Sequence, residues 1–236
     1  MARAVRFEQM SPGDLDEVLT EVPVAYVPLG TLEFHGWHMP LGFDALKAHA
    51  ICWRAAVETG GVVLPPNFQG FGGGHREFPG SIMIDEAPFR QNLRITLERL
   101  LAMGFRVIVL LTGHYPDEQV RAVKALADEV MEARPDVVVI ALPEYEAYPN
   151  EIRADHAAQW ETSIALYLMP ELVDLARLDA HSDPLYGIGG EDPRTAASAE
   201  LGQETVDTIV RVLARVVHGA LRSLHSSRRE PEGEVR

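Results

Sequence analysis

Four side chains that can bind metal ions or transfer protons lie close together near residue 40. They follow an apolar run at residues 22–29, and they are Glu33, His35, His38 and Asp44. If that run is a strand, Glu33 and His35 leave it in extended conformation, where side chains two residues apart point to the same side. A carboxylate, an imidazole and a second carboxylate nearby suit Zn, Mn or Fe as ligands. The stretch predicts a metal site. The alternative is a polar loop with surface histidines, in which Asp44 caps the following helix.

A histidine much later in the chain takes a comparable position. Residues 107–111 are apolar without interruption, which predicts a central strand, and His114 comes soon after it. In open α/β sheets, ligands bind beyond the carboxyl ends of the strands. Glu33, His35 and His114 each follow a predicted strand, so we expect residues about 80 positions apart to meet at that edge.

Strands and helices alternate along the chain. Apolar runs predict strands at residues 22–29, 62–64, 107–111 and 137–142. Helical spacing of apolar residues, with start signals and closing glycines, predicts helices at residues 11–20, 44–59, 89–101, 120–131 and 196–224. Such alternation produces a mostly parallel sheet with helices on both faces. The expected fold is a single-domain, three-layer α/β/α structure over residues 1–225, followed by a polar, disordered tail at 226–236.

The composition restricts partners and location. A formal charge of −14 argues against nucleic-acid binding, because a phosphate backbone needs a basic surface. No apolar run is long enough to cross a bilayer, and the first residues lack the hydrophobic core of a signal peptide. The lone cysteine, Cys52, cannot form an internal disulfide. We therefore expect a cytoplasmic protein that acts on a small molecule and has no nucleic-acid or membrane partner.

Several motifs resemble those of one family. Residues 30–40, followed by Asp44, resemble the N-terminal signature of the creatininase (creatinine amidohydrolase) family, which reads Gly-Ser/Thr-x-Glu-x-His-Gly-x-His-x-Pro and ends in Asp. Residues 74–82 resemble the family's His-x-x-Phe-Pro-Gly-Thr/Ser loop, and residues 112–114 its Asn-Gly-His segment. Residues 155–163 resemble its His-Ala-Gly-x-x-Glu-Thr-Ser segment, and residues 189–193 and 197–202 the loop and helix start that follow. The matches occur in order over residues 22–206, so the chain is identified as a member of this creatininase-like group.

The resemblance implies a site for two divalent ions, with Zn, Mn or Fe as candidates. The implied ligand sets share Asp44 as a bridge: one set is Glu33, Asp44 and His114, and the other is His35, Asp44 and Glu161. His156 is implied as the proton-transfer residue. Glu161 could also act as a catalytic base, and a carboxylate at a helix start is favoured by the helix dipole alone.

Three further residues are expected to contact the substrate, and they are His75, Tyr115 and Trp160. His75 lies in a glycine-rich loop at residues 70–80 that lacks the fingerprints of phosphate and dinucleotide sites. The resemblance makes this loop a wall of the active site, and a structural role for His75 is the alternative. We expect His38 to support the ligands rather than bind an ion. Surface or packing roles are expected for the remaining histidines and the cysteine: His49, His181, His218, His225 and Cys52.

One departure from the family bears on the substrate. Creatininase proper carries an acidic metal ligand two residues after the histidine of its Gly-His-Tyr segment, where this chain has Pro116. Either Glu161 supplies the missing ligand or the second ion is weakly held. Creatinine is therefore a doubtful substrate. Thr112 for Asn and Ala158 for Gly are milder changes, which affect loop packing.

The expected function is metal-dependent hydrolysis of a non-peptide C–N bond in a cyclic amide or formamide. The ions would polarise the carbonyl and lower the pKa of bound water from about 15.7 towards about 7, and His156 would protonate the leaving nitrogen. Hydrolysis of a lactone or diketone and trimming of a modified peptide are alternatives. A lyase, an isomerase or a metal-dependent binding module would be a non-hydrolytic alternative. Incorporation of labelled oxygen from water into the product distinguishes hydrolysis from these functions. The family also implies a homo-oligomer, often a hexamer.

Overall fold

Five parallel strands form the centre of the protein, in the order β1-β3-β2-β4-β5. The structure is a computed structural model, and it describes residues 4–148 and 155–227. The strands are β1 (Ala4–Arg6), β2 (Val24–Leu29), β3 (Gly61–Val63), β4 (Val107–Thr112) and β5 (Val138–Pro143). All six residues of β2 and of β4 are buried, as expected for central strands covered on both faces.

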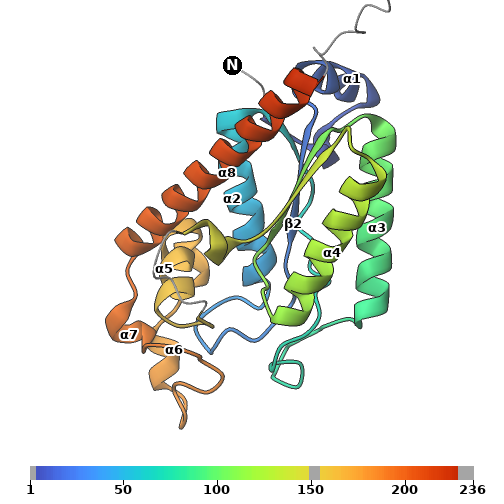
Figure 1. Cartoon of the computed structure of the whole chain (residues 1–236). Coiled ribbons are helices and arrows are strands. Elements are labelled where there is room, and N and C mark those ends of the chain that lie inside the picture. Colours follow the sequence, from blue (N-terminus) through green and yellow to red (C-terminus); the bar gives the residue numbers. More distant parts are fainter. Residues whose placement is uncertain (1–3, 149–154, 228–236) are drawn as a thin grey trace, which may run out of the picture.

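Two layers of helices enclose this sheet (Figure 1). One face is packed against α2 (Phe43–Thr59), α5 (Gln159–Leu168) and α8 (Ala199–Ser227), and the other against α1 (Pro12–Glu21), α3 (Glu86–Met103) and α4 (Asp117–Ala133). Short helices lie in the connections: η1 (Phe7–Gln9), η2 (Glu144–Ala147), η3 (Pro170–Leu172), α6 (Ala176–Asp179) and α7 (Pro193–Ala196). The three-layer α/β/α prediction is confirmed, and every strand pairing in the described residues is parallel.

The alternation of side chains along β4 divides the core in two. Val107, Val109 and Leu111 belong to the cluster under α2, α5 and α8, whereas Ile108 and Leu110 belong to the cluster under α3 and α4. Successive side chains of a strand point to opposite faces, so an uninterrupted apolar run supplies both layers. This is the reason the sequence of a central strand shows no polar alternation.

The longest helix, α8, has 29 residues, but only one of its faces is apolar. Val206, Ile209, Leu213 and Val217 are buried at helical spacing. In the part of the chain that the structure describes, no helix combines the length and the apolar character needed to cross a membrane.

The predicted elements end within about one to three residues of the observed bounds, and two differences have a clear physical reason. Strand β1 was not predicted, because its three residues are too few to show a period. Helix α8 begins at Ala199, three residues later than predicted, because the Ser198 hydroxyl accepts the Leu201 N–H and starts a new helix after α7. It continues to Ser227, so the predicted tail at 226–236 contributes two residues to the helix and otherwise lies outside the described residues.

The predicted site lies at the carboxyl ends of the strands, towards the bottom of Figure 1. The segments after β2 and β4 approach the first turn of α2 very closely. A Cβ atom on Gly30 would lie 2.2 Å from the Ala45 nitrogen, and one on Gly113 would lie 2.3 Å from the Asp44 carbonyl oxygen. Only glycine permits such contacts, so these two positions bring the loops carrying Glu33 and His114 against Asp44.

Candidate metal centre

Glu33, Asp44 and His114 form one group of potential ligands. His114 Nδ1 lies 2.9 Å from Glu33 Oε2 and 3.2 Å from Asp44 Oδ2. The three residues come from the loop after β2, the start of α2 and the loop after β4, and all are buried. Side chains that the sequence separates by up to 81 positions therefore meet at one point.

His35, Asp44 and Glu161 form a second group beside the first. His35 Nε2 lies 3.0 Å from Asp44 Oδ1 and 3.6 Å from Glu161 Oε2. Asp44 thus gives one oxygen to each group. Within each group the potential ligand atoms lie within 4.8 Å of one another, and the two sets are those that the family resemblance implied. Glu33, His35 and His156 make a third, overlapping set.

The second ring nitrogen of each histidine contacts a backbone carbonyl oxygen. His35 Nδ1 lies 3.0 Å from the Glu33 oxygen, and His114 Nε2 lies 3.2 Å from the Phe71 oxygen. A carbonyl oxygen only accepts, so these nitrogens carry the hydrogen. In the neutral imidazole, the other ring nitrogen, which faces the carboxylates, then carries a lone pair that can bind a metal ion. Metal-binding histidines are held by outer hydrogen bonds of this kind.

The charges of the group favour a cation. Burial lowers the pKa of His35 and His114, but the neighbouring carboxylates outweigh it and raise the two pKa values to about 9 and about 10. Burial raises the pKa of Glu33, yet hydrogen bonds with His114 and His75 lower it to about 2. Asp44 Oδ2 is buried, and its contact with His114 Nδ1 at 3.2 Å does not have the geometry of a hydrogen bond. Three carboxylates and two oriented imidazoles fit divalent ions such as Zn, Mn or Fe.

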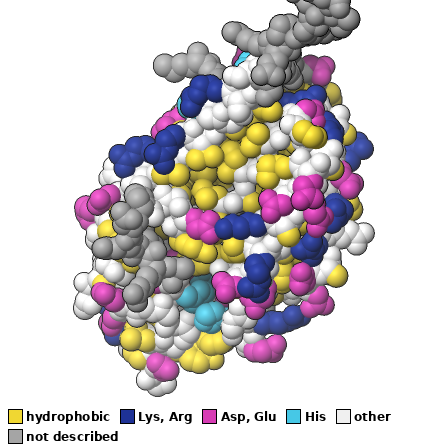
Figure 2. Space-filling view, in the orientation of Figure 1, with side chains coloured by type: hydrophobic (Ala, Val, Ile, Leu, Met, Phe, Trp, Pro, Cys, Tyr) yellow, Lys and Arg dark blue, Asp and Glu magenta, His cyan; other side chains and the backbone are white. Residues whose placement is uncertain are grey.

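These groups open into a cavity of about 270 Å³ lined also by His75, Tyr115 and His156. The His75 ring stacks on His156 at 4.0 Å between centroids, and His75 Nδ1 lies 3.0 Å from Glu33 Oε1. His156 Nε2 donates to the Phe34 carbonyl oxygen at 2.8 Å, which leaves Nδ1 to exchange protons. Burial and the neighbouring His35 lower the pKa of His156. Figure 2 shows histidine at the surface in the lower half of the view, at the end where these loops lie.

Three predicted residues do not line this cavity: Trp160, His38 and the buried His35. Trp160 lines a neighbouring pocket, with its ring 6.1 Å from that of Tyr148. His38 lies behind the ligands, and its Nε2 bonds the Thr162 hydroxyl at 2.8 Å. None of the remaining histidines belongs to a potential metal-binding group within residues 4–148 and 155–227, and His181 stacks on Trp37.

Sequence analysis missed three charged residues at the site. Lys47 is fully buried, and its Nζ lies 2.7 Å from Glu161 Oε1 and 2.5 Å from Glu144 Oε1. Asp155 accepts hydrogen bonds from the backbone N–H groups of Trp160 and Glu161, which holds the start of α5. A signal was available for two of them. Lys47 lies one helical turn after Asp44, and Glu144 directly follows a strand, at the edge where ligands gather.

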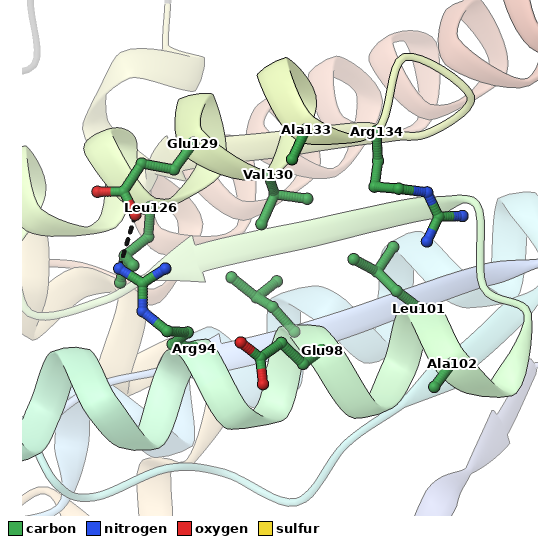
Figure 3. A pocket seen from close by; sticks show the side chains of 10 residues that line it. Arg94, Glu98, Leu101, Ala102, Leu126, Glu129, Val130, Ala133 and Arg134 are labelled. Carbon is green, nitrogen blue, oxygen red and sulfur yellow. Dashed lines mark hydrogen bonds and ion pairs between the residues drawn. The ribbon is translucent and has the colours of Figure 1, made fainter.

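A groove of similar size, about 320 Å³, lies between α3 and α4 (Figure 3). Leucine, valine and alanine side chains form its floor, and Arg94 pairs with Glu129 at one end. Its lining residues include no histidine and no cysteine. Its carboxylates, Glu98 and Glu129, are accompanied by Arg94 and Arg134, so the groove does not gather ligand groups as the site beside Asp44 does.

The chain is similar to proteins of known activity. A sequence model of the creatininase family, described as creatinine amidohydrolase, matches residues 8–217. The creatinine amidohydrolase of Pseudomonas putida is 30% identical over 230 residues, which covers 84% of this chain and 88% of that protein. The mycofactocin precursor peptide peptidase of Mycolicibacterium smegmatis is 30% identical over 161 residues, 64% of this chain and 60% of the peptidase.

Solved structures agree with the sequence comparison. A crystal structure of creatininase superposes with a TM-score of 0.78 at 26% identity, covering 92% of this chain and 98% of that one. Other creatininase structures, with TM-scores of 0.77 and 25% identity, are described as a manganese form and a zinc–zinc form. The sequence match over most of the length and the shared fold lead to one conclusion: the chain belongs to the creatininase family.

Proposed function

We propose that the protein is a divalent-metal-dependent hydrolase that cleaves a non-peptide C–N bond of a small cyclic amide or formamide. The observation that carries the proposal is Asp44, whose two oxygens belong to two adjacent groups of ligands. The oriented histidines of both groups support it, and so do the metal-bound relatives.

In this proposal, Glu33, Asp44 and His114 hold one ion, and His35, Asp44 and Glu161 hold the other. Bound divalent ions polarise a carbonyl group and lower the pKa of bound water to about 7. His156 keeps its Nε2 hydrogen on the Phe34 carbonyl, so Nδ1 takes up a proton and delivers it to the leaving nitrogen. His75 and Tyr115 line the cavity and orient the substrate.

The identity of the substrate decides which bond the proposed enzyme cleaves. Pro116 cannot supply the acidic ligand of creatininase proper, so we propose a substrate other than creatinine. The peptidase relative supports a second candidate, trimming of a modified peptide, because it shows that a C–N bond of a peptide is acted on by a similar protein. Lactone hydrolysis is a third candidate. Supplying cyclic amides, formamides, lactones and short peptides with Zn, Mn and Fe in turn separates these activities.

The variant Asp44→Ala tests the mechanism. Since Asp44 is shared, its loss is expected to reduce metal content from two ions per chain to less than one and to abolish turnover. Metal content is measured by elemental analysis and turnover with the best substrate of the screen. The matched control is Asp117→Ala, whose carboxylate is 86% exposed at the start of α4. Unchanged metal content and activity in Asp44→Ala would rule the mechanism out.

We also propose that the protein is a cytoplasmic homo-oligomer, and the family resemblance implies a hexamer. Leu41 and Ile82 support self-association, because they are 41% and 64% exposed and both adjoin the segment around Leu32 and Glu33. Exposed apolar side chains of this size are often covered in assemblies. Light scattering during size-exclusion chromatography gives the number of subunits.

A further inference from the structure

We propose that Lys47 is a positioning residue for the second ion: its ammonium group fixes one oxygen of Glu161 and leaves the other oxygen to face His35. This inference rests on the proposed metal-dependent function. It concerns how this chain builds the half of the site that contains His35, Asp44 and Glu161, where Pro116 replaces an acidic residue of creatininase proper.

Lys47 is buried and contacts two carboxylates and two aromatic rings. Its side chain is fully buried, and Nζ bonds Glu161 Oε1 at 2.7 Å and Glu144 Oε1 at 2.5 Å. Nζ also lies 4.6 Å from the ring centroid of Phe43 and 5.0 Å from that of Tyr115. A buried ammonium group is stable only with such partners, so its position is determined by them.

The two oxygens of Glu161 have different partners. Oε1 accepts from Lys47 Nζ and from the Tyr115 hydroxyl at 2.8 Å. Among the described residues, Oε2 accepts one hydrogen bond, from the Ala157 N–H at 2.8 Å, and it lies 3.6 Å from His35 Nε2. A carboxylate oxygen offers two lone pairs. Those of Oε1 are used, whereas Oε2 keeps one that would be available to an ion held with His35 and Asp44.

This arrangement favours Glu161 as a ligand through Oε2 over Glu161 as the general base. Lys47 and Tyr115 already occupy Oε1, and the Ala157 N–H takes one lone pair of Oε2. Proton transfer is then left to His156.

Glu144 connects this arrangement to the sheet. It directly follows β5, and it bonds the side of Lys47 Nζ that Glu161 does not use. The link runs from β5 through Glu144 and Lys47 to Glu161. Within the described residues, Lys47 forms no hydrogen bond or ion pair with Glu33 or His114, whereas it bonds Glu161 directly, so Lys47 acts mainly on the second group.

The test is to titrate metal-free protein with Zn and follow each binding step by calorimetry, with Co as a spectroscopic probe of ligand geometry. The variants are Lys47→Met, Lys47→Arg and Lys47→Met/Glu144→Gln. The matched control is Lys124→Met, since Lys124 is an exposed lysine that pairs with Glu146. Circular dichroism checks that each variant is folded.

In Lys47→Met the second ion is expected to bind roughly 10–100-fold more weakly, the usual effect of removing an outer partner of a ligand. The first ion is expected to keep its affinity within about twofold. Lys47→Arg should recover part of the loss, and Lys124→Met should match wild type. The cobalt spectrum of the second site should change in Lys47→Met and stay unchanged in Lys124→Met.

Two results would overturn the inference: wild-type affinity for both ions in Lys47→Met, or equal weakening of both ions, which a merely structural role would produce. If Lys47→Met does not fold, the double variant decides by the same criteria, because it removes both charges of the Lys47–Glu144 pair. If wild-type protein binds no divalent ion, the proposed function itself fails. The two failures are therefore distinguishable.

Discussion

At the residue scale, two histidines of one short segment are buried under opposite electrical conditions. His35 lies among Asp44, Glu161 and Glu33, and their charges outweigh burial and raise its pKa to about 9. His38 has a neutral partner, the Thr162 hydroxyl. Burial, and then the charge of His35, lower the pKa of His38 to about 4, against a weak opposing effect of Asp192. Two histidines only three residues apart therefore have pKa values shifted in opposite directions, because their neighbours differ in charge.

This difference predicts acid sensitivity. The pKa of His38 falls from 6.5 in the unfolded chain to about 4 on folding, so below pH 6.5 the unfolded state binds the proton more readily. The stability that neutral His38 contributes is present above pH 6.5 and is lost as pH falls to about 4, by roughly 3 kcal/mol. The free-energy gap between wild type and His38→Gln in urea unfolding should narrow by about that amount over this range.

The control for this prediction is His218→Gln, because His218 is exposed on α8. Its gap to wild type should stay constant with pH. A constant gap for His38→Gln as well would show that folding does not lower the pKa of His38.

At the scale of elements, the site depends on how closely the loop after β4 approaches α2. Gly113 stands at this contact, where an added Cβ would meet the Asp44 carbonyl oxygen at 2.3 Å and Lys47 Cε at 3.2 Å. Backbone cannot yield as a flexible side chain can. A larger residue at position 113 must therefore move His114 away from Asp44. This movement would disrupt the first group of ligands.

Gly113→Ala is expected to cost about 1–3 kcal/mol of stability, the usual range for overpacking. It should also weaken binding of the first ion by about tenfold or more, because ligand positions must be accurate to about 0.5 Å. Urea unfolding and zinc calorimetry measure the two effects. Gly74→Ala is the matched control, since an added Cβ there meets no atom within 4 Å. Wild-type zinc affinity in Gly113→Ala would contradict the argument.

At the scale of the whole molecule, bound ions would connect distant parts of the chain. The proposed ligands come from the loop after β2, the first turn of α2, the loop after β4 and the start of α5. A ligand that binds only the folded state stabilises it by about 2.7 kcal/mol at a hundred times its Kd. For a domain of this size, that corresponds to a rise in Tm of about 5–10 °C.

Removal of metal with a chelator should therefore lower the Tm by that amount, and Zn or Mn should restore it. Differential scanning calorimetry of the same sample before and after dialysis measures the shift. Asp44→Ala should show one Tm with and without chelator. An equal shift in this variant would mean that the ions stabilise the fold from some other site.

The sequence by itself determined the layers, the central strands and the segments that carry the ligands. Apolar runs at 22–29 and 107–111 specify buried strands because side-chain period is a local property, and strand ends then place Glu33, His35 and His114 at one edge. The motif resemblance supplied Glu161 and His156 as candidates. Their roles as ligand and proton donor stay predictions, which the experiments above test.

Only the tertiary structure decided which of these side chains touch. Lys47 and Glu161 are 114 positions apart, and their bond depends on how α5 packs beside α2 under α8. The same packing directs Trp160 into a neighbouring pocket and Tyr115 onto Glu161. Local patterns carry no information about such pairings, because the contact exists only after the helices have found their places on the sheet.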